Sequence, residues 1–92
     1  MTHVVFFRFP DLEVAREAAA RLRSLEGRVP TLASIEVGVD ELRTQRSWDV
    51  CLITRFADLA GMEAYQEHPA HLEVAAYIRA HAVGAAAVDW TD

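Results

Sequence analysis

The segment at residues 3–9 constrains the fold more than any other part of the sequence, because it forms a predicted strand that is apolar on both faces. Side chains along a strand alternate between its two faces. In residues 3–9 the side chains of Val5, Phe7 and Phe9 share one face, and those of Val4 and Phe6 share the other. In residues 48–56 Val50 and Leu52 lie on one face, and Cys51 and Ile53 lie on the other. Helices cover one face only, and the other would expose an apolar patch that is unusual for a monomer. We therefore expect helices on one face of the sheet and a second copy of the chain on the other.

Alternating and helical periodicities predict four strands and three helices in one domain of residues 1–92. The expected strands are residues 3–9, 33–40, 48–56 and 84–90, and residues 41–47 read as an exposed hairpin connection. The first helix carries apolar side chains at Val14, Ala18, Leu22 and Leu25 and is capped by Gly27, and the other two helices span residues 58–67 and 69–83. This order predicts an α+β βαββαβ fold, a four-stranded antiparallel sheet with helices on one face.

Charge and hydropathy exclude several classes of partner. The chain has a net charge of -5, nine basic residues that are all arginine, and no basic cluster, so we expect no nucleic acid partner. No apolar stretch approaches the roughly 20 residues that a membrane span needs, and we expect a cytoplasmic protein without membrane contact. The single cysteine, Cys51, falls within an apolar strand and is expected to be a buried small hydrophobic residue rather than a nucleophile.

The segment at residues 65–71, Tyr-Gln-Glu-His-Pro-Ala-His, places groups that transfer protons near neutral pH around a predicted helix start. Pro69 suits the first helical position, which puts His71 in the first turn. The positive end of the helix dipole disfavours a charged imidazole there, so His71 is expected to be neutral and able to accept a proton. His71 also shares the apolar face of this helix, whose other members are Val74, Ala75, Ile78 and Ala82.

Tyr65 is expected to reach the same cavity as His71 from the preceding helix. Asp58 is a suitable N-cap for that helix, and Leu59, Met62 and Tyr65 form a predicted inward row. The alternative is that both are ordinary buried side chains whose hydrogen bonds go to backbone carbonyls. A metal site is not expected, because His68 and His71 provide only two ligands.

The chain resembles the stress-responsive A/B barrel (Dabb) family of dimeric α/β barrel proteins over nearly its full length. The matching segments are residues 3–9, 29–30, 35–38, 48–50, 55–56, 65–71 and 88–89, of which the His-Pro-Ala-His core after a tyrosine is the most specific. The resemblance implies a ferredoxin-like fold and a homodimer in which two sheets form a barrel.

The family includes plant stress proteins, bacterial proteins without an assigned role, and a plant polyketide cyclase that makes olivetolic acid without a cofactor. By resemblance to that cyclase, Tyr65 and His71 are catalytic and His3 lines the pocket. The implied reaction is an intramolecular aldol closure, in which His71 takes a methylene proton and Tyr65 donates a hydrogen bond to the oxyanion. The resemblance to the cyclase implies neither a metal nor a cofactor. Where the cyclase has aromatic side chains, this chain has Ala18, Ala19, Leu22 and Ala82, which fits either a wider cavity or a closed core.

Three functional hypotheses follow. The first is a cofactor-free, polyketide cyclase-like enzyme that binds a small apolar or carbonyl compound. Its pocket wall would consist of His3, Val5, Phe7, Leu22, Leu52, Thr54 and Ile78, and the same apolar set would also serve as an ordinary core. The second is a non-catalytic stress-response dimer with a binding or structural role. The third is a cofactor-independent monooxygenase of the related barrel type.

Overall fold

The structure is a computed structural model that describes residues 1–92. Its elements are β1 (Thr2–Arg8), α1 (Leu12–Arg23), β2 (Ser34–Val39), β3 (Val50–Arg55), α2 (Leu59–Glu67), α3 (Pro69–His81) and β4 (Gly84–Trp90). All neighbouring strands are antiparallel, and their order across the sheet is β2-β3-β1-β4. The predicted α+β, ferredoxin-like βαββαβ arrangement is therefore confirmed.

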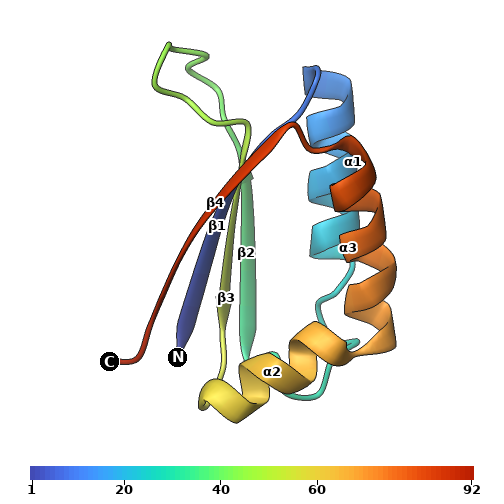
Figure 1. Ribbon diagram of the computed structural model, residues 1–92, viewed down its shortest axis with the longest axis vertical. Helices are drawn as coiled ribbons and strands as arrows, with labels where there is room; N and C mark the ends of the chain where they lie inside the picture. Colours follow the sequence, from blue (N-terminus) through green and yellow to red (C-terminus); the bar gives the residue numbers. More distant parts are fainter.

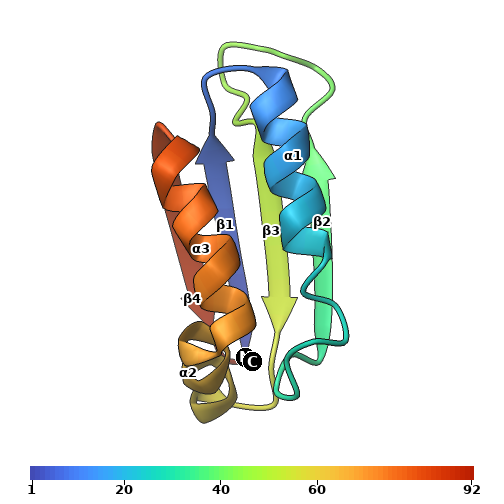
Figure 2. The ribbon, with the colours of Figure 1, turned by 90° about the vertical axis from the view of Figure 1, so that its right-hand side faces the viewer.

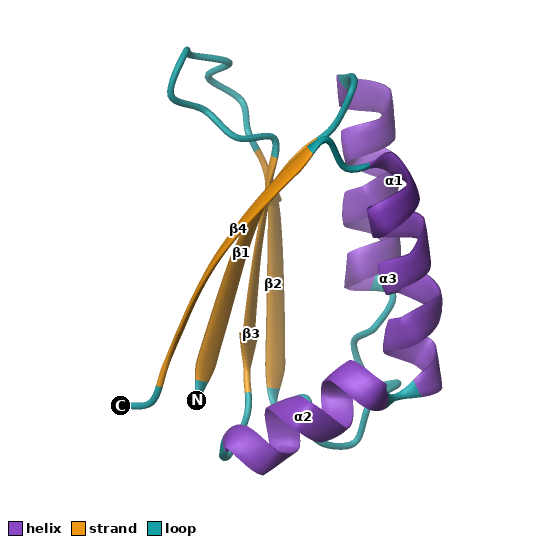
Figure 3. Ribbon diagram, viewed as in Figure 1, coloured by secondary structure: helices purple, strands orange, loops and turns teal.

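The molecule has two layers, a twisted sheet and a pair of helices. Figure 1 shows α1 and α3 side by side along one face of the sheet, with α2 lying across one end. In Figure 2 the helices stand in front of the sheet, with α3 over β1 and β4 and α1 over β2 and β3. Figure 3 shows that no helix covers the opposite face. None of the helices has the length and apolar character that a membrane span requires.

Short polar side chains and one proline determine where the helices begin. The carboxylates of Asp11 and Asp58 accept hydrogen bonds from the backbone N–H groups of the first turns of α1 and α2, as N-caps do. Pro69 is the first residue of α3, as predicted. Its N-cap is His68, whose Nδ1 accepts a hydrogen bond from the N–H of Ala70 at 3.1 Å.

Three predicted helix features differ in the structure, the first being that α3 ends at His81 rather than at residue 83. Helix α1 ends at Arg23 rather than continuing through Leu25, which is nevertheless fully buried within the turns that follow. Gly27 in these turns has a positive φ of 77°, a conformation that glycine adopts without strain. Leu59 does not belong to the inward row of α2, because as the first helical residue it projects from the end of the helix and is 53% exposed.

The core lies between the sheet and the two long helices. It comprises inward side chains of β1, β3, α1 and α3, and Met62 and Tyr65 close it at the α2 end. Because α1 contributes small residues at Ala15, Ala18 and Ala19, its backbone packs close to the sheet.

The opposite face of the sheet, called the outer face below, carries the second apolar set that the alternation predicted. The strand register aligns Val4 with Ile53 and Val88, and Phe6 with Cys51 and Ala86. Phe6 is 43% exposed and Val88 is 65% exposed. Such a continuous apolar surface over neighbouring strands is a feature of protein interfaces.

Candidate functional site

A pocket lies between the sheet and α3, on the helix-covered face. Its volume is about 230 Å³, and its lining residues are His3, Val5 and Phe7 from β1, Leu52 from β3, Leu22 from α1, and His71, Val74, Ala75, Ile78 and Arg79 from α3. Six of the seven residues expected to form the pocket wall therefore come together here. The seventh, Thr54, is fully buried outside the lining, where its hydroxyl donates a 3.4 Å hydrogen bond to the carbonyl of His3.

His71 lines this pocket from the first turn of α3 and is half-buried. Its Nδ1 lies 3.0 Å from the carbonyl oxygen of Gln66. A carbonyl only accepts hydrogen bonds, so Nδ1 carries the hydrogen and Nε2 of the neutral ring keeps its lone pair. Burial lowers the pKa of His71 more than the hydrogen bond to the Gln66 carbonyl raises it, and His3 and Arg79 also lower it. At neutral pH the ring is therefore an uncharged proton acceptor.

Tyr65 reaches His71 from the last turn of α2. Their ring centroids are 4.4 Å apart at an interplanar angle of 50°, and the Tyr65 ring also packs against Phe56 at 5.1 Å. The phenol hydroxyl is buried without a hydrogen-bond partner. Burial raises the pKa of Tyr65 to about 12, so the hydroxyl keeps its proton at neutral pH. The predicted proximity of Tyr65 and His71 is thus present, although Tyr65 itself does not line the pocket.

His3 lines the pocket from β1, and its Nδ1 is hydrogen-bonded to the carboxylate of Asp89 on the neighbouring strand β4. This pairing follows from the register, which places His3 directly opposite Asp89. The carboxylate can only accept, so it fixes the Nδ1–H form of His3 and leaves Nε2 for the pocket. Asp89 was not among the predicted site residues, because its pairing depends on a register between strands 86 residues apart.

Arg79 is the second residue of the site that was not predicted from the sequence. It lines the pocket from α3 and is exposed. A signal for it exists in the sequence, since Arg79 follows His71 and Ala75 at successive steps of four and so shares their side of the helix. An arginine near a helix C-terminus, however, also interacts favourably with the helix dipole, so its presence there does not by itself indicate a binding site.

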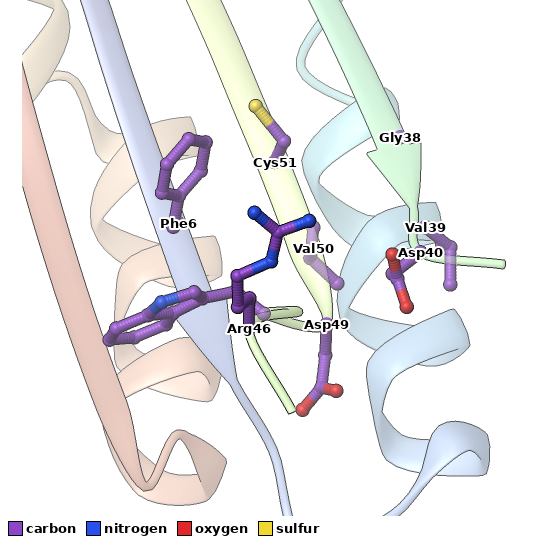
Figure 4. Close-up of a pocket in the computed structure, with 9 residues that line it drawn as sticks. Phe6, Gly38, Val39, Asp40, Arg46, Asp49, Val50 and Cys51 are labelled. Carbon is purple, nitrogen blue, oxygen red and sulfur yellow. The ribbon is translucent and has the colours of Figure 1, made fainter. Parts of the chain in front are cut away.

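A larger cavity, of about 400 Å³, lies at the outer face and is distinct from this site. Figure 4 shows Phe6 on β1 and Cys51 on β3 at its wall, with the guanidinium of Arg46 extending beside them from the loop between β2 and β3. The sheet separates this cavity from Tyr65 and His71, which do not line it. It therefore belongs to the apolar surface of the outer face rather than to the candidate catalytic groups.

Comparison with known proteins gives a family match over the whole chain. A family model described as the stress responsive A/B barrel domain, Dabb, matches residues 1–92. No curated protein sequence matches the chain.

Several solved structures share the fold. A dimeric protein of unknown function and ferredoxin-like fold from Bacteroides fragilis has a TM-score of 0.84 at 23% identity, and the match covers 97% of this chain and 92% of that one. A dimeric ferredoxin-like protein of unknown function from Thermobifida fusca has a TM-score of 0.82 at 24% identity, covering 95% and 85%. The hydroxynitrile lyase from Passiflora edulis has a TM-score of 0.79 at 16% identity, covering 95% and 87%. The same fold thus occurs in an enzyme and in proteins without an assigned reaction.

Proposed function

The chain belongs to the stress-responsive A/B barrel family, and we propose that it is a homodimeric, cofactor-free enzyme that removes a proton next to the carbonyl group of a small apolar compound. A polyketide cyclase-like aldol closure is one reaction of this kind. Membership of the family does not by itself fix a reaction, so the proposal depends on the groups around the pocket.

One observation carries the proposal: the buried Tyr65 hydroxyl has no hydrogen-bond partner, and the Tyr65 ring packs against a neutral histidine with a free Nε2. A buried hydroxyl without a partner is destabilising by about 1–3 kcal/mol, and its presence calls for an explanation such as a ligand. A substrate carbonyl oxygen would supply the missing acceptor. The adjacent His71 Nε2 would accept the proton that the same carbonyl makes acidic.

The proposed reaction balances with proton transfers alone. His71 Nε2 takes a proton from the carbon next to the carbonyl, and the electrons of the C–H bond move to the carbonyl oxygen, where the Tyr65 hydroxyl stabilises the enolate. In an aldol closure the enolate carbon then attacks a second carbonyl of the same molecule and forms a C–C bond. His71 returns the proton to the resulting alkoxide. Because no electron is gained or lost overall, the reaction needs no oxidant.

We infer that the active form is a homodimer joined through the outer face. Phe6 and Val88 of that face are exposed in the single chain, and the related structures from Bacteroides fragilis and Thermobifida fusca are described as dimeric. Pairing two such faces would bury Phe6 and Val88 and leave both pockets on the outside of the assembly.

Hydrogen exchange at carbon tests the proposed reaction. Butyrophenone, a single-ring ketone, is incubated with the protein in deuterated water, and loss of the proton NMR signal next to the carbonyl is followed. The wild type should accelerate exchange. His71→Gln should lower the rate by about 100-fold or more, the usual contribution of a general base. His81→Gln is the matched control, because His81 Nδ1 bonds a backbone carbonyl in the same way outside the pocket. Equal exchange by the wild type and His71→Gln would contradict the proposal.

A second candidate, the non-catalytic binding dimer, is favoured by the depth of Tyr65. The residue is 1% exposed, and it is not among those that line the pocket. Saturable binding of butyrophenone without any exchange would support this candidate over the enzyme.

A further inference from the structure

The polar side chains that line the pocket are all nitrogen bases or cations. They are His3, His71 and Arg79, and the remaining lining residues are apolar. No carboxylate lines the pocket, and that of Asp89 is engaged by His3. Because His71 is neutral and His3 is paired with Asp89, Arg79 is the charge that the lining offers, and in a chain with a net charge of -5 its guanidinium would attract an anion.

Arg79 is available to bind such an anion. Its guanidinium takes part in no hydrogen bond, ion pair or aromatic contact within the chain. Guanidinium groups bind carboxylates through two parallel hydrogen bonds, which fix orientation as well as charge. The exposed position of Arg79 places this group at the mouth of the pocket, whereas the apolar walls lie deeper.

The distance along α3 limits the shape of the ligand. Arg79 lies eight residues after His71, which corresponds to about 12 Å between their backbones along the helix. Both side chains line one pocket, and the charge of Arg79 acts on His71, so a single small molecule can contact both. The volume of about 230 Å³ is below the roughly 300–1,000 Å³ of pockets for drug-sized ligands and suits a molecule with one ring.

We propose that the pocket selects a small apolar oxo-acid, whose carboxylate pairs with Arg79 at the mouth while its carbonyl lies at His71. This inference rests on the proposed function of the site and adds the substrate class. Arg79 is thus a specificity-determining residue that orients the carbonyl toward the base.

Binding of a matched pair of ligands tests the role of Arg79. β-Benzoylpropionate and butyrophenone are both phenyl ketones. The chain of the first ends in a carboxylate, and that of the second ends in a methyl group. By calorimetry, the wild type should bind the acid about tenfold more tightly than the ketone, and added salt should weaken only the acid. Arg79→Gln should abolish this preference, so that the acid binds no more tightly than butyrophenone. Arg28→Gln removes the same charge from an exposed residue outside the pocket and should keep the preference.

The outcomes separate this inference from the proposed function. If the acid and the ketone bind equally well, or if Arg79→Gln keeps the preference, the oxo-acid inference is wrong even when exchange of butyrophenone still depends on His71. If the preference depends on Arg79 but neither ligand exchanges protons, the oxo-acid site stands as a binding site and the enzyme is refuted. If neither ligand binds, both are refuted.

Discussion

Replacing Tyr65 with phenylalanine should stabilise the protein while it abolishes turnover. The Tyr65 hydroxyl is buried and has no hydrogen-bond partner, and burial of such a group is unfavourable by about 1–3 kcal/mol. The substitution removes only this oxygen. The ring contacts with Phe56 and His71 remain, at centroid distances of 5.1 and 4.4 Å. Part of the gain is lost to the small space left behind, so we expect a net increase of about 1 kcal/mol in the free energy of unfolding.

This change is large enough to measure. A gain of about 1 kcal/mol raises Tm by roughly 4–8 °C in a domain of this size. With a urea m-value of about 1–3 kcal/mol/M, the unfolding midpoint should rise by roughly 0.3–1 M. Variants must be compared at one protomer concentration, because the proposed dimerisation would contribute to apparent stability.

Tyr77→Phe is the control, since Tyr77 is half-buried and stacks on His81 at 4.1 Å. Its stability should change by less than about 0.5 kcal/mol. A Tyr65→Phe variant that is less stable than wild type by about 1 kcal/mol would refute the reasoning, because it would mean that the hydroxyl has a partner in the native protein.

Three further predictions concern pH, the pocket and the outer face. The pKa of His71 in the folded protein lies below the ordinary 6.5, so as the pH falls the unfolded chain takes up the proton first. The contribution of His71 to the free energy of unfolding should therefore be complete above about pH 6.5 and decline as the pH falls toward the lower pKa of the folded protein. His71→Gln should flatten this decline in urea midpoints measured between pH 5 and 7, and an unchanged slope would assign it to another group. Ala75→Leu places a larger apolar side chain in the pocket lining and should abolish butyrophenone binding at unchanged or higher Tm, so retained affinity would place the binding site elsewhere. Phe6→Glu puts a charge on the outer face and should convert the dimer to monomer in sedimentation, whereas Leu42→Glu, at a loop residue that is 81% exposed, should not. Sedimentation as a dimer by both variants would exclude the outer face as the interface.

Local sequence signals were sufficient for most of the fold. Each helix start follows from a side chain that satisfies free N–H groups or from proline, and these effects act within four residues. The alternation in β1 also predicted that both faces of the sheet are apolar and that helices cover one of them. Helical periodicity placed Leu25 in a helix and Leu59 in a buried row, and both predictions were wrong because periodicity does not show where a helix begins or ends. Leu25 is buried by a turn, and Leu59 is exposed because it stands at the first position of its helix.

The candidate site was only partly accessible to such reasoning. The position of His71 is predicted by the apolar face of its helix. The apolar strand residues of the pocket wall are predicted by the alternation of side chains between the two faces of the sheet. The bond between His3 and Asp89 depends instead on which residues of β1 and β4 face one another, a relation between distant segments that composition does not encode. The unpartnered state of the Tyr65 hydroxyl is likewise a property of the packed interior and could not be read from the chain.

Half of the pocket wall comes from α3 alone, which supplies five of the ten lining residues. The helix lies between His68 and Ala82, two cap residues with extended backbone, so its 13 residues form a discrete cassette. Exchange of this cassette between relatives would alter half of the pocket wall in one step, while the strands that carry His3 and Leu52 stay in place. Such modularity offers a physical route by which one scaffold could acquire new substrates during evolution without rebuilding its core.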